Sequence, residues 1–229
     1  MDAREKTFVL AEGVNATIVG PLVSVPGWDA VACADSCVRN ANCSVFSMET
    51  GPGATVCQLG SDASTFLANP AGMSAALYYD RNLVPPGYEF ATITTEMHFL
   101  KPVSGMQDYQ TGLAACQTDG STTHLVQDDK GLDWHDFILQ YAASKLGAST
   151  VFWLGGDDLD GDLVYKWNDG TAVSASVQDF WYTGQPSYGY GETLEQCMVI
   201  HWESEGVVDE WNDGVCSELK GVICEKRLP

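Results

Sequence analysis

Side chains that carry oxygen gather between Gln185 and Cys224, around a proline and between cysteines. A hard cation such as Ca²⁺ takes roughly six to eight oxygen ligands, some charged and some neutral. The hydroxyl groups of a sugar can complete such a shell. Five of these residues are therefore candidate ligands of such a cation: Gln185, Ser187, Glu195, Asn212 and Asp213.

The proline inside this set suggests how two of the ligands converge. A peptide bond before proline is the only kind in which the cis form costs little. A cis bond between Gln185 and Pro186 would aim the side chains of Gln185 and Ser187 at one point. Glu195 and Asp213 would add two negative charges, enough to balance the ion.

The same residues also allow a purely structural interpretation. The tripeptide Asn-Asp-Gly occurs at 168–170 and again at 212–214, and it is a turn signal. The first copy has no companion ligands, so we predict only a turn there. The second copy has Gln185 and Glu195 as companions, which favours calcium binding.

A second group of carboxylates lies between Asp157 and Asp162. It fails the EF-hand pattern, because its glycine comes too early and the closing glutamate is missing. We expect a solvated acidic loop here.

The cysteine content indicates the compartment. Eight cysteines, an even number, are typical of a disulfide framework in an oxidising environment. Their spacings lack the paired C-x2-C of most zinc sites. Sequons begin at Asn15 and Asn42, which suits a secreted eukaryotic protein. Residues 1–6 lack the apolar segment of a signal peptide, so a secreted protein would be represented here by its mature form.

The formal net charge of −20 argues against nucleic acid and anionic membranes, which attract basic surfaces. No apolar run approaches the length of a membrane span. No nucleophile elbow, HExxH motif, P-loop or dinucleotide fingerprint occurs, so we predict no enzyme activity. His124 fits a packed core position, and His98, His135 and His201 show no metal-binding spacing.

The cysteines fall into two groups, separated by a turn-rich segment from Arg81 to Gly87. We therefore predict two domains, 1–83 and 84–229. Two disulfides in each would support cores that are otherwise marginal at the smaller size.

In the first half, residues 8–10 read as a strand and residues 29–37 as a helix with Asp29 as its N-cap. Cys33 and Cys37 are four residues apart, so they share one face of that helix. Residues 44–48 and 55–59 read as a hairpin. This cysteine spacing, with the strands that follow, resembles the PAN/apple family over about residues 7–80. The resemblance implies the bridges Cys33–Cys57 and Cys37–Cys43 and a possible protein partner, without assigning any site residue.

In the second half, residues 113–116 and 128–146 read as helices, the second from apolar residues at mostly helical spacing, including Leu132 and Trp134. Short strands follow at 123–126 and 152–156. The runs Phe152-Trp153-Leu154-Gly155-Gly156 and Tyr165 to Gly170 are landmarks, together with Trp181 and the Trp-Asn-Asp of 211–213. These features resemble the C-type lectin family over about residues 88–227. The chain is thus expected to be α+β, a disulfide-stapled PAN/apple domain followed by a C-type lectin fold with two helices, antiparallel sheets and a long calcium-binding loop.

The second resemblance implies the bridges Cys116–Cys224 and Cys197–Cys216. It also places the principal calcium and sugar site at the five residues introduced above, with Tyr188 or Tyr190 covering a sugar face and Trp202 a more remote candidate. Ser187 departs from the usual Glu-Pro-Asn or Gln-Pro-Asp triplets, which removes one carboxylate and predicts weaker calcium binding. Asp158 and Asp160 match the auxiliary calcium site, but Tyr188 and Gln196 stand where it needs carboxylates.

We therefore expect a secreted, calcium-dependent lectin that binds carbohydrate. Gln185 before the proline favours galactose-type ligands over mannose. The alternative is a calcium-independent protein-interaction or adhesion module in which the PAN half is the principal binder.

Overall fold

The computed structural model describes residues 6–11, 16–61, 64–68, 74–91, 98–148, 150–173, 180–189, 194–203 and 206–227. The chain forms two compact units, residues 1–99 with 227–229 and residues 100–226. Both contain helices and strands, so the α+β class is confirmed. The boundary expected between residues 83 and 84 stays a prediction.

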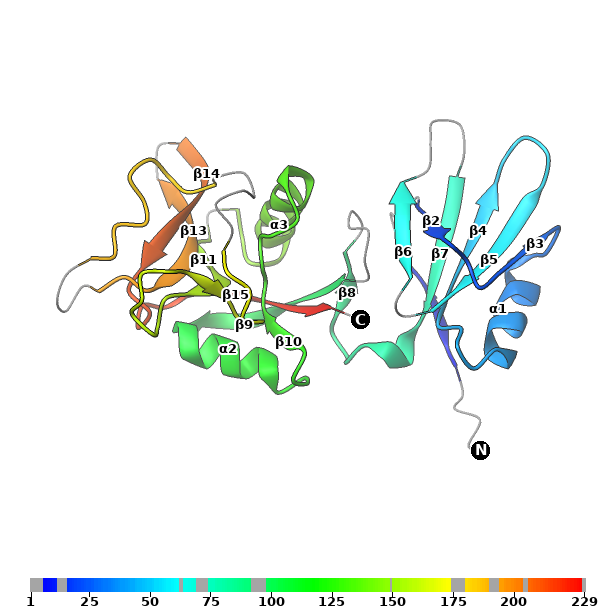
Figure 1. Cartoon of the computed structure of the whole chain (residues 1–229), viewed down its shortest axis with the longest axis horizontal. Coiled ribbons are helices and arrows are strands. Elements are labelled where there is room, and N and C mark those ends of the chain that lie inside the picture. Colours follow the sequence, from blue (N-terminus) through cyan, green and yellow to red (C-terminus); the bar gives the residue numbers. More distant parts are fainter. Residues whose placement is uncertain are drawn as a thin grey trace. The chain divides into compact units, whose positions relative to one another are not determined.

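The first unit is built on an antiparallel sheet with the strand order β1-β7-β4-β5-β3 (Figure 1). Strands β2 and β6 pair separately. The predicted hairpin is β4 and β5. The bounds are β1 Phe8–Leu10, β2 Ala16–Val19, β3 Val23–Pro26, α1 Ala30–Arg39, β4 Val45–Thr50, β5 Thr55–Gly60, β6 Thr65–Ala68, β7 Ser74–Asp80, a 3-10 turn Arg81–Leu83 and β8 Glu89–Phe90.

Helix α1 begins where the sequence predicts. The Asp29 side chain accepts a hydrogen bond from the backbone N–H of Ala32 at 2.8 Å, which satisfies one of the free donors of the first turn. Cys33 and Cys37 are fully buried, on the face of α1 that is turned away from solvent. Their sulfurs join Cys57 of β5 and Cys43 ahead of β4, so the helix is fixed to the sheet.

The second unit contains a sheet with the order β14-β13-β11-β15-β9, to which β10 adds against β15 and β12 against β11 (Figure 1). The bounds are β9 His98–Gln107, α2 Tyr109–Gln117, β10 Thr123–Leu125, α3 Leu132–Lys145, β11 Phe152–Asp157, β12 Lys166–Trp167, β13 Cys197–Glu203, β14 Gly206–Gly214 and β15 Lys220–Arg227. Disulfides join Cys116 of α2 to Cys224 of β15 and Cys197 to Cys216. All four disulfides are those expected from the two resemblances.

Helix α3 begins later than the sequence predicts. Gly131 precedes it with φ +91°, a left-handed conformation that interrupts the helix and that glycine adopts readily. Residues 128–131 form an irregular connection instead, in which Asp128 is buried and the other three are partly exposed. Leu132, expected on the core face, is 51 % exposed, whereas Trp134 and Ile138 are buried. The apolar spacing therefore identified the helix but not its first residue.

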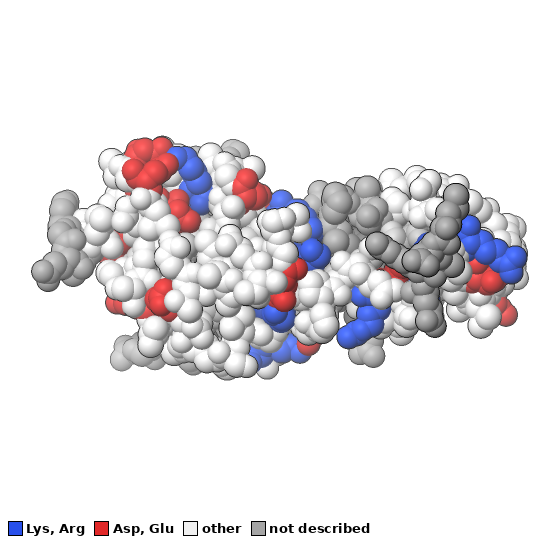
Figure 2. Space-filling view, turned by 90° about the horizontal axis from the view of Figure 1, so that it is seen from below, with Lys and Arg blue, Asp and Glu red and all other residues white. Residues whose placement is uncertain are grey.

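On the face shown in Figure 2, acidic side chains form several separate groups, and basic side chains lie beside some of them. The net charge of −20 taken over the whole sequence favours solubility. Within the described residues, no helix is long and apolar enough to cross a membrane.

A substitution at Gly155 of β11 would test how closely the second unit is packed around this strand. A Cβ at this position would lie 2.5 Å from the Leu125 carbonyl oxygen and 2.9 Å from the Asn168 side-chain oxygen. Backbone cannot yield cheaply, so Gly155→Ala is expected to lower the free energy of unfolding by about 1–3 kcal/mol. The matched control is Gly53→Ala, where a Cβ meets nothing within 4 Å. Urea unfolding of both variants decides, and equal stabilities would show that the close packing is wrong.

Candidate functional site

The candidate site is anchored on strand β14. Asn212 pairs with Val199 and Asp213 with Met198 of β13, so both lie within a regular antiparallel ladder. The turn interpretation of residues 212–214 is therefore wrong, because long-range strand pairing overrides the local turn signal. Asp213 is fully buried, and Asn212 is partly exposed.

A second segment, residues 180–186, is hydrogen-bonded to the backbone of Trp211, the residue before Asn212 on β14. The N–H of Trp211 donates to the Phe180 carbonyl at 2.5 Å, and its own carbonyl accepts from Tyr182 at 2.9 Å. The N–H of Gln185 then donates to the Tyr182 carbonyl at 2.9 Å. The Gln185–Pro186 bond is cis, as expected. Residues 180–186 are thus fastened to the residue that precedes Asn212.

Hydrogen bonds join the remaining predicted residues. The Ser187 hydroxyl donates to Glu195 Oε2 at 2.8 Å, and the Tyr188 N–H donates to Asp213 Oδ2 at 2.5 Å. The Glu195 N–H donates to the Tyr188 carbonyl at 3.1 Å. The structure therefore links Ser187 to Glu195, and Tyr188 to Asp213.

Three side-chain oxygens of this region are buried and accept no hydrogen bond from any part of the chain that the structure describes. They are Gln185 Oε1, Asn212 Oδ1 and Asp213 Oδ1. A buried polar atom without a partner costs about 1–3 kcal/mol. Amide and carboxylate oxygens are the ligands that calcium prefers. The residues present therefore fit a calcium ion chemically.

Carboxylates act electrostatically on the two tyrosines beside the site. Burial raises the pKa of Tyr165, and the carboxylates of Asp213 and Asp158 raise it further. Burial also raises the pKa of Tyr188, with the same two carboxylates as the next causes. Negative potential at both hydroxyls stabilises a nearby cation.

Of the two tyrosines expected to cover a sugar, the structure describes Tyr188. The Tyr188 ring stacks on Tyr165 with centroids 5.9 Å apart, and its hydroxyl donates to the Leu163 carbonyl at 3.1 Å. This ring packs the loop against the domain while remaining partly exposed. Tyr190 lies outside the described residues, as does the side chain of Trp202.

The acidic stretch forms a compact cluster. Carboxylate oxygens of Asp158, Asp160 and Asp162 all lie within 4.8 Å of one another. The Lys166 ammonium already contacts two of them, Asp160 at 2.5 Å and Asp162 at 2.8 Å. Gln196, at a position where the auxiliary site needs a carboxylate, instead donates its amide to the Asp158 carbonyl at 2.7 Å.

One buried acid near the site carries no recognisable sequence signal. Asp128 accepts hydrogen bonds from the Trp211 indole at 2.7 Å and from His135 Nδ1 at 2.5 Å. Its partners are 83 and 7 residues away. His135 shows no metal-binding spacing in the sequence, and the structure pairs it with a carboxylate.

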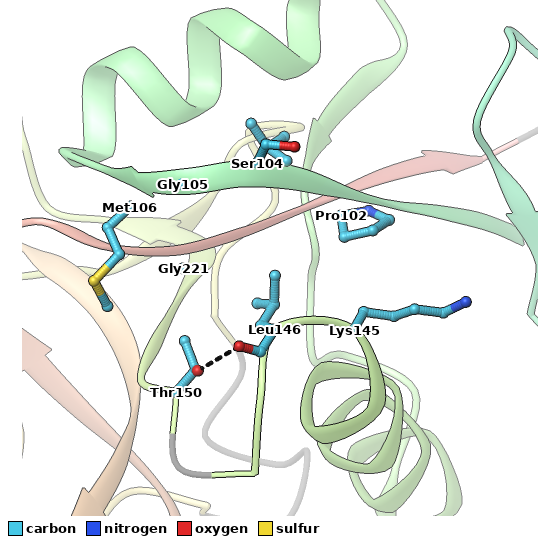
Figure 3. Close-up of a pocket in the computed structure, with 9 residues that line it drawn as sticks. Pro102, Ser104, Gly105, Met106, Lys145, Leu146, Thr150 and Gly221 are labelled. Atoms are coloured by element: carbon cyan, nitrogen blue, oxygen red, sulfur yellow. Dashed lines mark hydrogen bonds between the residues drawn. The ribbon is translucent and has the colours of Figure 1, made fainter.

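A cavity of about 360 Å³ lies elsewhere in this unit, between β9, the end of α3 and the start of β15 (Figure 3). Pro102, Met106 and Leu146 line it, and Lys145 is the single charged residue among the described residues that do so. The Thr150 hydroxyl donates a hydrogen bond to the Leu146 carbonyl at 2.9 Å. None of the predicted site residues lines this cavity, and its side chains indicate no reaction.

Comparison with known families gives the site its context. The family profile described as "Lectin C-type domain" matches residues 106–226, more than half of the chain and entirely within the second unit. The chain belongs to the C-type lectin family. This is a non-enzymatic family, in agreement with the prediction of no enzyme activity. The N-terminal unit has no family assignment.

Individual relatives are distant. CD209 antigen-like protein 2 of Macaca mulatta is 26% identical over 142 residues, which cover 62% of this chain and 49% of that protein. Ladderlectin of Oncorhynchus mykiss is 33% identical over 82 residues, covering 36% of this chain and 39% of that protein. The chain thus spans about half, or less, of the length of these relatives.

A solved structure shows the same fold. The C-type lectin CEL-I from Cucumaria echinata has a TM-score of 0.50 and 17% identity, with 62% of this chain and 95% of that chain covered.

Lys166 affects the titration of one carboxylate of the acidic cluster, that of Asp160. Its ammonium, hydrogen-bonded to Asp160, lowers the pKa of that carboxyl below its usual 3.8. A lowered folded-state pKa stabilises the fold above pH 3.8, and this contribution is lost as the pH falls through the lower value. Lys166→Met is expected to raise the pKa of Asp160, as measured by carboxyl NMR titration. Lys220→Met, whose partner is Glu218, is the control that should leave Asp160 unchanged. An unaltered Asp160 titration in Lys166→Met would contradict this assignment.

Proposed function

We propose that the second unit is an extracellular lectin domain that binds carbohydrate through calcium held by Gln185, Ser187, Glu195, Asn212 and Asp213. The observation that carries the proposal is the group of three buried oxygens without hydrogen-bond partners, on Gln185, Asn212 and Asp213. Membership of the C-type lectin family supports it independently.

The chain's own groups would divide the work between metal and sugar. The buried oxygens of Gln185, Asn212 and Asp213 face no competing donor among the described residues. The amide nitrogens of Gln185 and Asn212 would donate to sugar oxygens, and the carboxylate of Glu195 would accept from sugar hydroxyls. When bound, calcium would accept two adjacent sugar hydroxyls as ligands.

The missing carboxylate at Ser187 is expected to weaken calcium binding without abolishing it. In place of a third charge, the Ser187 hydroxyl donates to Glu195. This bond gives the alternative function its specific support, because it satisfies part of the site without a metal. That alternative is a calcium-independent module for protein interaction or adhesion.

For the first unit we propose a PAN/apple-like domain that offers a surface for a protein partner. Its support is the helix α1 fixed by two disulfides over an antiparallel sheet. Cys33, Cys37, Phe46 and Leu59 form one buried cluster between the helix and the sheet. The four disulfides of the chain suit secretion.

Calcium should stabilise the folded protein. A ligand that binds only the native state at a hundredfold excess over its Kd adds about 2.7 kcal/mol. The expected rise in Tm is about 5–10 °C for a chain of this size. Thermal unfolding in calcium and in chelator measures it. Asp213→Asn should lose the rise, and Glu218→Gln, an exposed acid paired with Lys220, should keep it. An identical Tm in calcium and chelator would favour the calcium-independent alternative.

The sugar preference is expected to be galactose-type. Gln185 before the proline is the residue found in galactose-type relatives, and Tyr188 or Tyr190 would cover the apolar face of the sugar. We expect galactose or N-acetylgalactosamine to compete better than mannose for binding in calcium on a glycan array. Stronger competition by mannose would overturn this preference while leaving the calcium proposal intact.

Ser187→Asp extends the same prediction to the metal. The new carboxylate would face Glu195, so it should destabilise the calcium-free protein by like-charge repulsion and lower the calcium Kd roughly tenfold. Galactose binding should strengthen in parallel. Ser187→Ala removes the hydroxyl without adding charge and serves as the control, with calcium affinity no better than that of the parent. Titration calorimetry with calcium measures both variants.

A further inference from the structure

Asp128 is an unusual residue to find in the interior of the second unit. It is completely buried, in the connection between β10 and α3. One carboxylate oxygen, Oδ2, accepts from both Trp211 Nε1 and His135 Nδ1. The other, Oδ1, has no hydrogen-bond partner among the described residues. Burying a carboxylate is costly, and a well-packed apolar side chain often serves stability as well.

The geometric consequence of Asp128 is a closed circuit of contacts. Its first partner, Trp211, lies on β14 directly before Asn212. Its second partner, His135, stacks on the Phe180 ring with centroids 4.2 Å apart. Phe180 returns to Trp211, because its carbonyl accepts the Trp211 N–H and the two rings pack 5.4 Å apart.

Two sets of candidate calcium ligands follow residues of this circuit along the chain. Asn212 and Asp213 follow Trp211 along β14. Gln185 follows Phe180, through the turn in which its N–H donates to the Tyr182 carbonyl. A shift in the indole of Trp211 would therefore move the two sets of ligands relative to each other.

We propose that Asp128 is a positioning residue for the calcium site, acting through Trp211 on one side and through His135 and Phe180 on the other. This inference rests on the proposed function. Among the described residues Asp128 makes hydrogen bonds to Trp211 and His135 and to no candidate calcium ligand, so its effect on calcium passes through the orientation of these rings. The requirement is an acceptor oxygen at this position rather than a negative charge.

Four variants separate position from charge. Asp128→Ala removes the acceptor, and Asp128→Asn keeps one acceptor oxygen while removing the charge. Trp211→Phe removes the indole N–H from the other end of the same bond. The control is Trp153→Phe, because Trp153 is equally buried in this unit but its N–H donates to the Gln107 carbonyl. Titration calorimetry gives the calcium Kd of the full chain, and thermal unfolding in chelator gives the stability of each variant.

We expect Asp128→Ala and Trp211→Phe each to raise the calcium Kd about tenfold or more, since misplaced ligands lose affinity. A double variant, Asp128→Ala with Trp211→Phe, should lose less affinity than the sum of the two single changes, because both single changes break the bond between Trp211 and Asp128. Asp128→Asn should remain within about threefold of the parent, even though its stability in chelator falls. Trp153→Phe should lose stability and keep its calcium Kd.

The outcomes distinguish this inference from the proposed function. Calcium binding by the parent that is unaffected in Asp128→Ala would overturn the positioning role alone. An Asp128→Asn variant as weak as Asp128→Ala would also overturn it, in favour of a direct effect of charge. Absence of calcium binding by the parent itself would overturn both. Should Asp128→Ala unfold, the comparison of Asp128→Asn, Trp211→Phe and Trp153→Phe still decides.

Discussion

The indole of Trp211 lies among three other aromatic rings, while its N–H reaches a buried carboxylate. Trp167, Trp181 and Phe180 all pack against it, with centroids 5.4–5.8 Å away. Its backbone N–H and carbonyl are both hydrogen-bonded to the neighbouring segment. Because each polar group and each face of the residue is engaged, turning Trp211 would break several interactions together. The candidate ligands connected to Trp211, Asn212 along the chain and Gln185 through Tyr182, are therefore held in place with it.

The site must be rigid because it keeps polar oxygens buried without hydrogen-bond partners, which is unfavourable. Three buried oxygens without partners cost about 1–3 kcal/mol each, and a loose loop would turn them toward water. The Cys197–Cys216 disulfide encloses the β13–β14 pair and joins residues 19 apart, a closure worth about 3 kcal/mol in the chain-entropy model. The ladder of β13 and β14 adds regular backbone bonds. The fold thus offsets a local cost that is useful only to a ligand.

Sequence patterns predicted what depends on neighbours along the chain. Asp29 and the cysteine spacing of α1 are local signals, and the helix follows them. The signal for a turn at 212–214 was overridden by pairing with β13, which local propensity does not contain. Asp128 was assigned to the start of a helix, because nothing near it in sequence indicates a partner 83 residues away. The later start of α3 has a local cause in Gly131, whereas the pairing of β14 with β13 and the partner of Asp128 are long-range contacts, and these long-range contacts build the site.

Two groups of carboxylates in this unit show how local charge decides a role. Asp160 and Asp162 share the Lys166 ammonium, so an internal cation already satisfies them. Asp213 lies in a ladder opposite Met198, and among the described residues no lysine pairs with it and one of its oxygens is left without a donor. Composition alone would rank the first cluster higher, since it holds three acids within 4.8 Å. Affinity for a metal depends instead on which oxygens remain uncompensated, and these lie beside Trp211.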